Sequence, residues 1–154
     1  MDRLRYRSAS VGALLAAVAL PARSPLSARS AHAAEPEPAI VATMSCERAA
    51  EPGRVRCAVE ARAVGGRSIS WADVAIVELP DFAAALKGRI GPGDATFRDV
   101  ATQKWAFGLV ARKGGEGEAR VRVRAVVCAP SPGDAGTPSC RPATLDVRAK
   151  IVVG

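Results

Sequence analysis

The sequence of 154 residues contains a single histidine, His32, and this scarcity removes most familiar routes to catalysis. Histidine is the usual general acid–base group near neutral pH. Without it, Ser–His and Cys–His nucleophile pairs and mixed Cys/His zinc sites are lost as well. Because His32 lies in a segment that we expect to be removed, a hydrolytic enzyme is nearly excluded. The only unusual chemistry left belongs to the four cysteines, which are Cys46, Cys57, Cys128 and Cys140.

No apolar run reaches the length of about 20 residues that a transmembrane helix needs. The uncharged run at residues 9–20 follows an arginine-rich start and precedes an Ala-His-Ala motif that ends at Ala33. This order is typical of a secretory signal peptide. We therefore expect residues 1–33 to be a signal peptide, cleaved near Ala33, and residues 34–39 to be a disordered lead. An uncleaved, membrane-anchoring N-terminus is the alternative interpretation.

The basic character of the chain is concentrated in this first segment. Residues 1–33 contain five arginines and one aspartate, so more than half of the net charge of +7 belongs to them. The net positive charge was the main argument for a nucleic-acid partner, and less than half of it remains in the mature chain. We therefore expect no nucleic-acid partner, and no membrane span, for the mature chain. The mature protein is expected to be exported, periplasmic or secreted, and disulfides are the default state of cysteines in such compartments.

Apolar residues alternate with polar ones from Ile40 onward, and this period of two predicts β-strands. Glycine- and proline-rich turns separate the strands, as at Gly65-Gly66. Residues 81–103 look irregular, with a short helical turn at 81–87. Short strands without a long helical pattern predict an all-β protein, with residues 40–154 forming one antiparallel β-sandwich.

Strand registers separate the cysteines into two pairs. If Cys46 faces Cys57 across a hairpin, Met44 faces Val59, and apolar residues mostly meet apolar ones. Both cysteines then lie on the apolar face. This predicts a buried, structural disulfide between Cys46 and Cys57.

The second pair, Cys128 and Cys140, is predicted on the polar face of its hairpin. If Cys128 faces Cys140, Val121 faces Val147 and Val123 faces Leu145 on the apolar side. The cysteines then share the polar face with three arginines, at positions 120, 122 and 124. Pro142 has no N–H, so its row and the cysteine row are best placed as non-hydrogen-bonded pairs, which are closely spaced.

Three interpretations of these cysteines remain open. Both pairs can be structural disulfides, which is common in small exported domains. Alternatively, an exposed and closely spaced Cys128–Cys140 bridge can be redox-active, with Arg124 and Arg141 stabilising its thiolates. An all-cysteine zinc site is the third interpretation, although spacings of eleven and twelve residues suit hairpins better than the close pairs of zinc sites.

The C-terminal hairpin resembles the N-terminal periplasmic domain of the thiol:disulfide interchange protein DsbD. The residues that carry the likeness are Ala125-Val126-Val127-Cys128, a loop, Cys140-Arg141-Pro142-Ala143-Thr144, and the earlier segments Val77-Glu78-Leu79-Pro80 and Phe97-Arg98-Asp99. The likeness spans roughly residues 69–153. It implies an immunoglobulin-like fold, with Cys128 and Cys140 as the redox pair of a thiol:disulfide oxidoreductase component that needs no cofactor. Its partners would be periplasmic thiol/disulfide proteins and a separate membrane or thioredoxin-like reductant.

Two further features have two interpretations each. Trp71 and Trp105 are expected in the core, although they could form a binding platform. The arginines of residues 120–124 are expected on a solvated face, although they could bind an anionic partner. The acidic residues lack the paired spacing of a metal or glycosidase site. An exported thiol–disulfide exchange domain is therefore the predicted function, and a structural or binding β-sandwich with two inert disulfides is the alternative.

Overall fold

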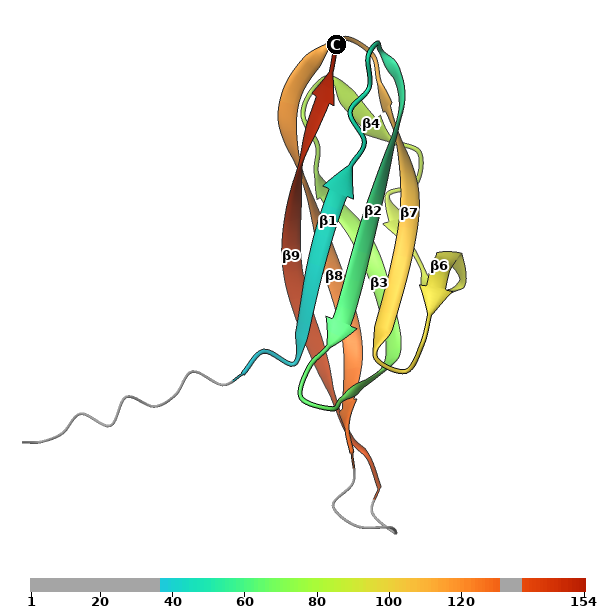
Figure 1. Ribbon diagram of the computed structural model, residues 1–154, viewed down its shortest axis with the longest axis vertical. Helices are drawn as coiled ribbons and strands as arrows, with labels where there is room; N and C mark the ends of the chain where they lie inside the picture. The colour runs from blue at the N-terminus through green and yellow to red at the C-terminus, as the bar shows by residue number, and fades with distance from the viewer. Residues whose placement is uncertain (1–36, 131–136) are drawn as a thin grey trace, which may run out of the picture. The chain divides into compact units, whose positions relative to one another are not determined.

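The computed structural model describes residues 37–130 and 137–154, which belong to one compact unit that spans Pro36–Gly154. The predicted signal peptide and the first half of the predicted lead, residues 34–36, lie outside the described residues. The described part consists almost entirely of strands (Figure 1). In chain order the elements are β1 (Ile40–Cys46), β2 (Gly53–Ala63), β3 (Ser68–Glu78), β4 (Ala83–Ala85), β5 (Arg89–Ile90), the short 3₁₀ helix η1 (Pro92–Asp94), β6 (Ala95–Arg98), β7 (Thr102–Ala111), β8 (Gly115–Ala129) and β9 (Ser139–Val153). No helix among these residues is long and apolar enough to cross a membrane.

The strands form two antiparallel sheets that pack face to face. The first sheet has the order β1-β2-β7-β4, with β6 also paired to β7, and the second has the order β5-β3-β8-β9. Two packed antiparallel sheets of this kind make an immunoglobulin-like sandwich. The predicted fold class is therefore confirmed.

Both predicted hairpin registers are confirmed residue by residue. Cys46 faces Cys57 across β1 and β2, and Cys128 faces Cys140 across β8 and β9. The like-charged pair of the second register, Arg120 and Arg148, is accommodated because each arginine forms an ion pair with a different glutamate. Hydrophobic alternation was sufficient to fix these registers because a slip of one residue would turn every apolar side chain outward.

The core lies between the sheets and is made by the inward-facing alternate positions. Trp105 is fully buried, and its indole N–H donates to the carbonyl oxygen of Gly91 over 3.1 Å. Val121 and Val123 are also fully buried, as predicted. Leu145 and Val147 are only half-buried, because β9 is the last strand of its sheet and has a covering neighbour on one side alone.

The segment between β3 and β7 differs from its predicted form. Instead of a helical turn at 81–87, β4 joins the first sheet beside β7, β5 joins the second sheet beside β3, and β6 returns to β7. The three alanines of β4 have no strong preference that would resist this pairing. Because β7 and β3 would otherwise leave backbone N–H and C=O groups unpaired, the crossing segment satisfies both sheet edges in turn.

Candidate functional site

The four cysteines form two separate disulfides. Cys46 bonds to Cys57 and Cys128 bonds to Cys140, and the Cα atoms of the two pairs lie 4.0 and 3.9 Å apart. The bridges lie at opposite ends of the sandwich, because β1 ends near the end of β9, whereas Cys140 stands at its start. The four cysteines therefore do not come together as ligands of one zinc ion. Among the described residues, no group of three or more His, Cys, Asp or Glu is placed to hold a metal ion.

The Cys46–Cys57 bridge belongs to the core. Cys57 is 1% exposed, and Cys46 is half-buried against the same apolar cluster. The predicted location of this pair on the apolar face is confirmed. A partner protein has no direct access to the Cys57 sulfur in this arrangement.

The Cys128–Cys140 bridge lies on the outer face of the second sheet, where the two cysteine residues differ in exposure. Cys140 is exposed, whereas Cys128 is only 7% exposed. Both cysteines lie on the outer face that the alternation of the sequence predicts, but the alternation carries no sign of this asymmetry. Cys128 is covered because β8 is an inner strand, with Ser68 of β3 on one side and Cys140 of β9 on the other.

The hydrogen-bond pattern of β9 shows which way the backbone of Cys140 points. The carbonyl oxygen of Val152 accepts a hydrogen bond from the N–H of Ala49, so it points away from β8. The β8–β9 register has no bulge, so every second residue back from Val152, including Pro142 and Cys140, has the same orientation. The predicted non-hydrogen-bonded pairing of Cys128 with Cys140 is therefore confirmed. The N–H and C=O of Cys140 face the open edge of the sheet.

Close spacing does not single out this bridge. The N–H of Glu47 donates to the carbonyl oxygen of Arg56 over 2.9 Å, which makes the preceding Cys46–Cys57 row a non-hydrogen-bonded pair as well. Both bridges thus share one cross-strand geometry. Exposure of Cys140 is the property that distinguishes the second bridge.

An apolar row lies beside the Cys128–Cys140 bridge on the same outer face. Trp71, Val126 and Pro142 stand side by side on β3, β8 and β9. Trp71 is 36% exposed, so its predicted core location is wrong, whereas that of Trp105 is right. The cause is a register shift between Ile69 and Trp71, which turns Trp71 to the outer face.

The next row contains a buried carboxylate that the sequence analysis did not identify. Asp73 is 1% exposed and accepts hydrogen bonds from Arg124 over 2.9 and 2.6 Å, and from Arg89. Burial raises the pKa of Asp73, but the hydrogen bonds from Arg124 and Arg89 outweigh this effect and hold its pKa below the ordinary value. Arg124 is thereby committed to Asp73, and its guanidinium also lies 6.0 Å from the Trp71 ring. The prediction that Arg124 stabilises the thiolates of Cys128 and Cys140 therefore loses support.

The second predicted basic neighbour, Arg141, also fails to join the bridge. Arg141 has the opposite parity to Cys140 on β9, and it lines a small hollow of about 220 Å³ together with Arg67 and Ser139. The two arginines proposed from sequence are thus not brought together around the sulfurs.

The arginines of β8 are neutralised by carboxylates on neighbouring strands. Arg122 donates two hydrogen bonds to Asp146, over 2.7 and 3.0 Å, and Arg120 forms an ion pair with Glu78. The hydrogen bonds from Arg122 lower the pKa of Asp146. This arrangement favours a solvated, salt-bridged face over an anion-binding one.

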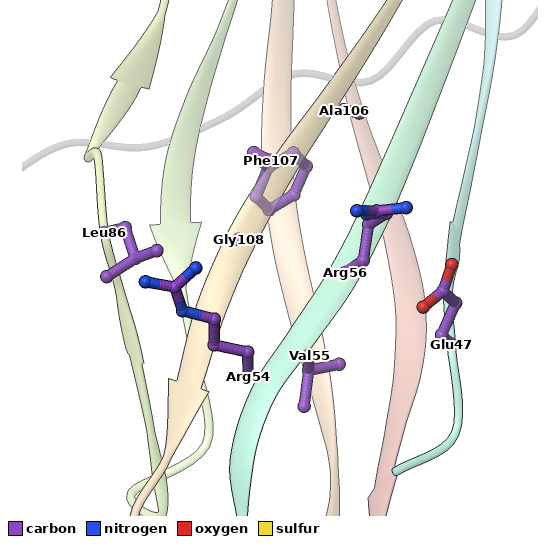
Figure 2. Close-up of a pocket in the computed structure, with 8 residues that line it drawn as sticks. All are labelled: Glu47, Arg54, Val55, Arg56, Leu86, Ala106, Phe107 and Gly108. Atoms are coloured by element: carbon purple, nitrogen blue, oxygen red, sulfur yellow. The ribbon is translucent and has the colours of Figure 1, made fainter.

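A cleft of about 480 Å³ lies on the outer face of the first sheet and was also missed by sequence reasoning (Figure 2). It is lined by Glu47, Arg54, Val55, Arg56, Leu86, Ala106, Phe107 and Gly108. Its arginines come from alternate positions of β2 and face Gly108 and Val110 of β7. The alternation of Arg54 and Arg56 was visible in the sequence, but the pairing of β2 with β7 was not.

Comparison with known proteins defines no family for this chain. No protein-family model matches the sequence, and no curated protein matches it. Among solved structures, the chain is similar to the ASH/PapD-like domain 7 of human CEP192, with 9% identity and a TM-score of 0.39, covering 93% of this chain and 97% of that one. It is also similar to BslA, a bacterial hydrophobin, with 9% identity and a TM-score of 0.33, covering 75% and 94% of the two chains. The strand order and the two disulfides define the class as a disulfide-bonded, immunoglobulin-like β-sandwich.

Proposed function

We propose that this protein is an exported thiol–disulfide exchange domain of the DsbD N-terminal type, with Cys128–Cys140 as its redox pair. The observation that carries the proposal is the unequal exposure of the two cysteine residues. Cys140 is exposed on the edge strand β9, whereas Cys128 is buried on the neighbouring strand β8. An incoming thiolate therefore has one accessible target and one direction of approach.

The exchange reaction needs only thiols from the partner. The partner thiolate attacks the Sγ of Cys140, the Cys128–Cys140 bond breaks, and Cys128 leaves as a thiolate. A second partner thiolate then attacks the partner's own sulfur in the mixed disulfide and releases Cys140 as a thiolate. The partner dithiol is thereby oxidised to a disulfide, and the pair gains two electrons and, in the end, two protons. The reverse sequence reduces a downstream disulfide.

The surroundings of Cys140 suit docking of a protein partner. The row of Trp71, Val126 and Pro142 supplies an apolar contact next to the attacked sulfur. The outward N–H and C=O of Cys140 can pair with an extended partner segment, as edge strands do. We propose periplasmic thiol/disulfide proteins as partners, with a separate membrane or thioredoxin-like reductant, and export through the N-terminal signal peptide.

A specific observation also favours the alternative, a structural or binding β-sandwich with two inert disulfides. Both bridges have the same cross-strand geometry, and Arg124 is held by Asp73 rather than by a cysteine. A bridge without a nearby free cation has no special stabilisation of its thiolate form.

Selective reduction by a thioredoxin-like dithiol protein tests the proposal. The oxidised domain is mixed with the reduced partner, and the free thiols are alkylated and located by peptide mass analysis. We expect alkylation at Cys128 and Cys140 while Cys46 and Cys57 stay bridged. The variant with both Cys128 and Cys140 changed to Ala is the matched control and should take no label. No reduction of either bridge would establish the inert sandwich instead.

A further inference from the structure

We propose that the cleft around Arg54, Arg56 and Leu86 binds a small amphiphilic anion, a carboxylate or phosphate carried on a short apolar group. This site lies on the first sheet, whereas the Cys128–Cys140 bridge lies on the second. The inference therefore does not depend on disulfide exchange.

The cleft contains two arginines that form no ion pair among the described residues. Within residues 37–130 and 137–154, neither Arg54 nor Arg56 has a carboxylate within ion-pair distance, and both side chains are exposed. Further along the same outer face of β2, Arg62 and Lys104 share Glu60 at 3.0 and 2.8 Å. The two ends of this face thus differ in ion pairing: Glu60 is bound by two cations, whereas the arginines of the cleft form no ion pair in the described part of the chain.

Strand pairing explains the difference. Arg54 and Arg56 face Val110 and Gly108 across β7, and neither residue carries a charge. On the other side, Glu47 stands opposite Arg56, to whose carbonyl oxygen its N–H donates over 2.9 Å, and it contributes one negative charge against two positive ones. A guanidinium pair with excess positive charge is suited to bidentate recognition of a carboxylate or phosphate.

An apolar wall stands beside these arginines. Leu86 is 57% exposed, and its backbone is held against β7 because its N–H donates to the carbonyl oxygen of Gly108 over 3.2 Å. A Cβ added at Gly108 would lie 2.9 Å from Leu86 Cδ1, so the leucine packs directly on the glycine backbone. In Figure 2 the guanidinium of Arg54 points toward Leu86, which places the charge next to the apolar wall.

The dimensions of the cleft suit a small ligand. Its volume of about 480 Å³ falls within the usual range of roughly 300–1,000 Å³ for small-molecule sites. A second hollow of about 250 Å³ lies beyond Leu86 and shares Ala106 and Gly108 with the first. An anionic head between the arginines would leave its apolar tail against Leu86 and Ala106.

Binding is tested on the full chain by NMR titration with hexanoate and with hexyl phosphate. Hexanamide, which has the same apolar chain without a charge, and inorganic phosphate, which lacks the chain, are the matched probes. We expect saturable binding of at least one amphiphilic anion, at least tenfold tighter than hexanamide or inorganic phosphate. The tighter of the two amphiphiles identifies the head group. Absence of saturable binding, or equal binding of hexanamide, would overturn the proposal.

Variants locate the site. The double change Arg54→Gln with Arg56→Gln should weaken binding at least tenfold, whereas Arg62→Gln, on the same face of the same strand, should leave it unchanged. Leu86→Ser should weaken the amphiphile but not inorganic phosphate. These side chains are exposed, so the variants should keep the wild-type circular dichroism spectrum. Equal loss in the Arg62 variant, or no loss in the double variant, would contradict the assignment.

Discussion

Asp73 lies directly opposite Arg124 across β3 and β8, and its buried carboxylate accepts two hydrogen bonds from that guanidinium. Arg89 of β5 forms an ion pair with the same carboxylate. One side chain thus ties three neighbouring strands of the second sheet together. This relationship explains how the two-residue strand β5 is held at the edge of β3, and it leads to the first two predictions.

Replacing Asp73 should destabilise the fold. Asp73→Asn should lower the free energy of unfolding by about 1–3 kcal/mol, because the buried side chain loses charge-assisted hydrogen bonds while its arginine partners stay solvated. Urea denaturation measures the change. The matched control is Glu78→Gln, which removes an exposed partner of Arg120 and should cost less than about 1 kcal/mol. Equal effects of the two changes would contradict the role assigned to Asp73.

Stability should fall at acid pH, in part through the same residue. The folded-state pKa of Asp73 lies below the ordinary value of 3.8, so its contribution is present above that value. The contribution is lost as the pH falls from about 4 through the folded-state pKa. Unfolding free energies measured between pH 6 and pH 2 should show a smaller loss in Asp73→Asn than in the wild type. Parallel curves for the two proteins would rule out this linkage.

The core disulfide should stabilise the fold without taking part in exchange. Changing both Cys46 and Cys57 to Ala should lower stability by about 2–3 kcal/mol, because an eleven-residue separation in the unfolded chain is no longer closed. Thermal melting measures the loss, and thiol alkylation measures the exchange reactivity of the remaining pair. An unchanged melting temperature, or altered exchange at Cys128–Cys140, would count against this assignment.

Single-cysteine variants should reveal which sulfur is attacked. Cys128→Ala leaves the exposed Cys140 thiol, and Cys140→Ala leaves the buried Cys128 thiol. We expect oxidised glutathione to modify Cys140 at least about tenfold faster than Cys128, because attack requires an open path to the sulfur. The same variants in unfolding denaturant are the control and should react at similar rates. Faster reaction of Cys128 in the folded state would reverse the proposed order of attack.

Local patterning was sufficient to predict the long strands, both hairpin registers and the disulfide pairing, but not the short strands β4, β5 and β6. Cys46–Cys57 and Cys128–Cys140 could be matched because each hairpin has one register that joins apolar to apolar residues. Trp71 and Asp73 were assigned wrongly or missed because a register shift in β3, invisible in the alternation, moves Trp71 to the outer face. The cleft around Leu86 could not be predicted, because it forms only when residues 83–98 cross between the sheets. That crossing depends on long-range strand pairing, which local alternation does not reveal.

The reduction potential of Cys128–Cys140 tests the central claim most directly. The full chain carrying Cys46→Ala and Cys57→Ala is equilibrated with glutathione and dithiothreitol buffers, and its free thiols are counted after alkylation. The exchange function predicts a potential between about −120 and −270 mV, the range of known exchange proteins. A potential below about −300 mV, typical of structural bridges, would contradict it and leave a β-sandwich with two inert disulfides.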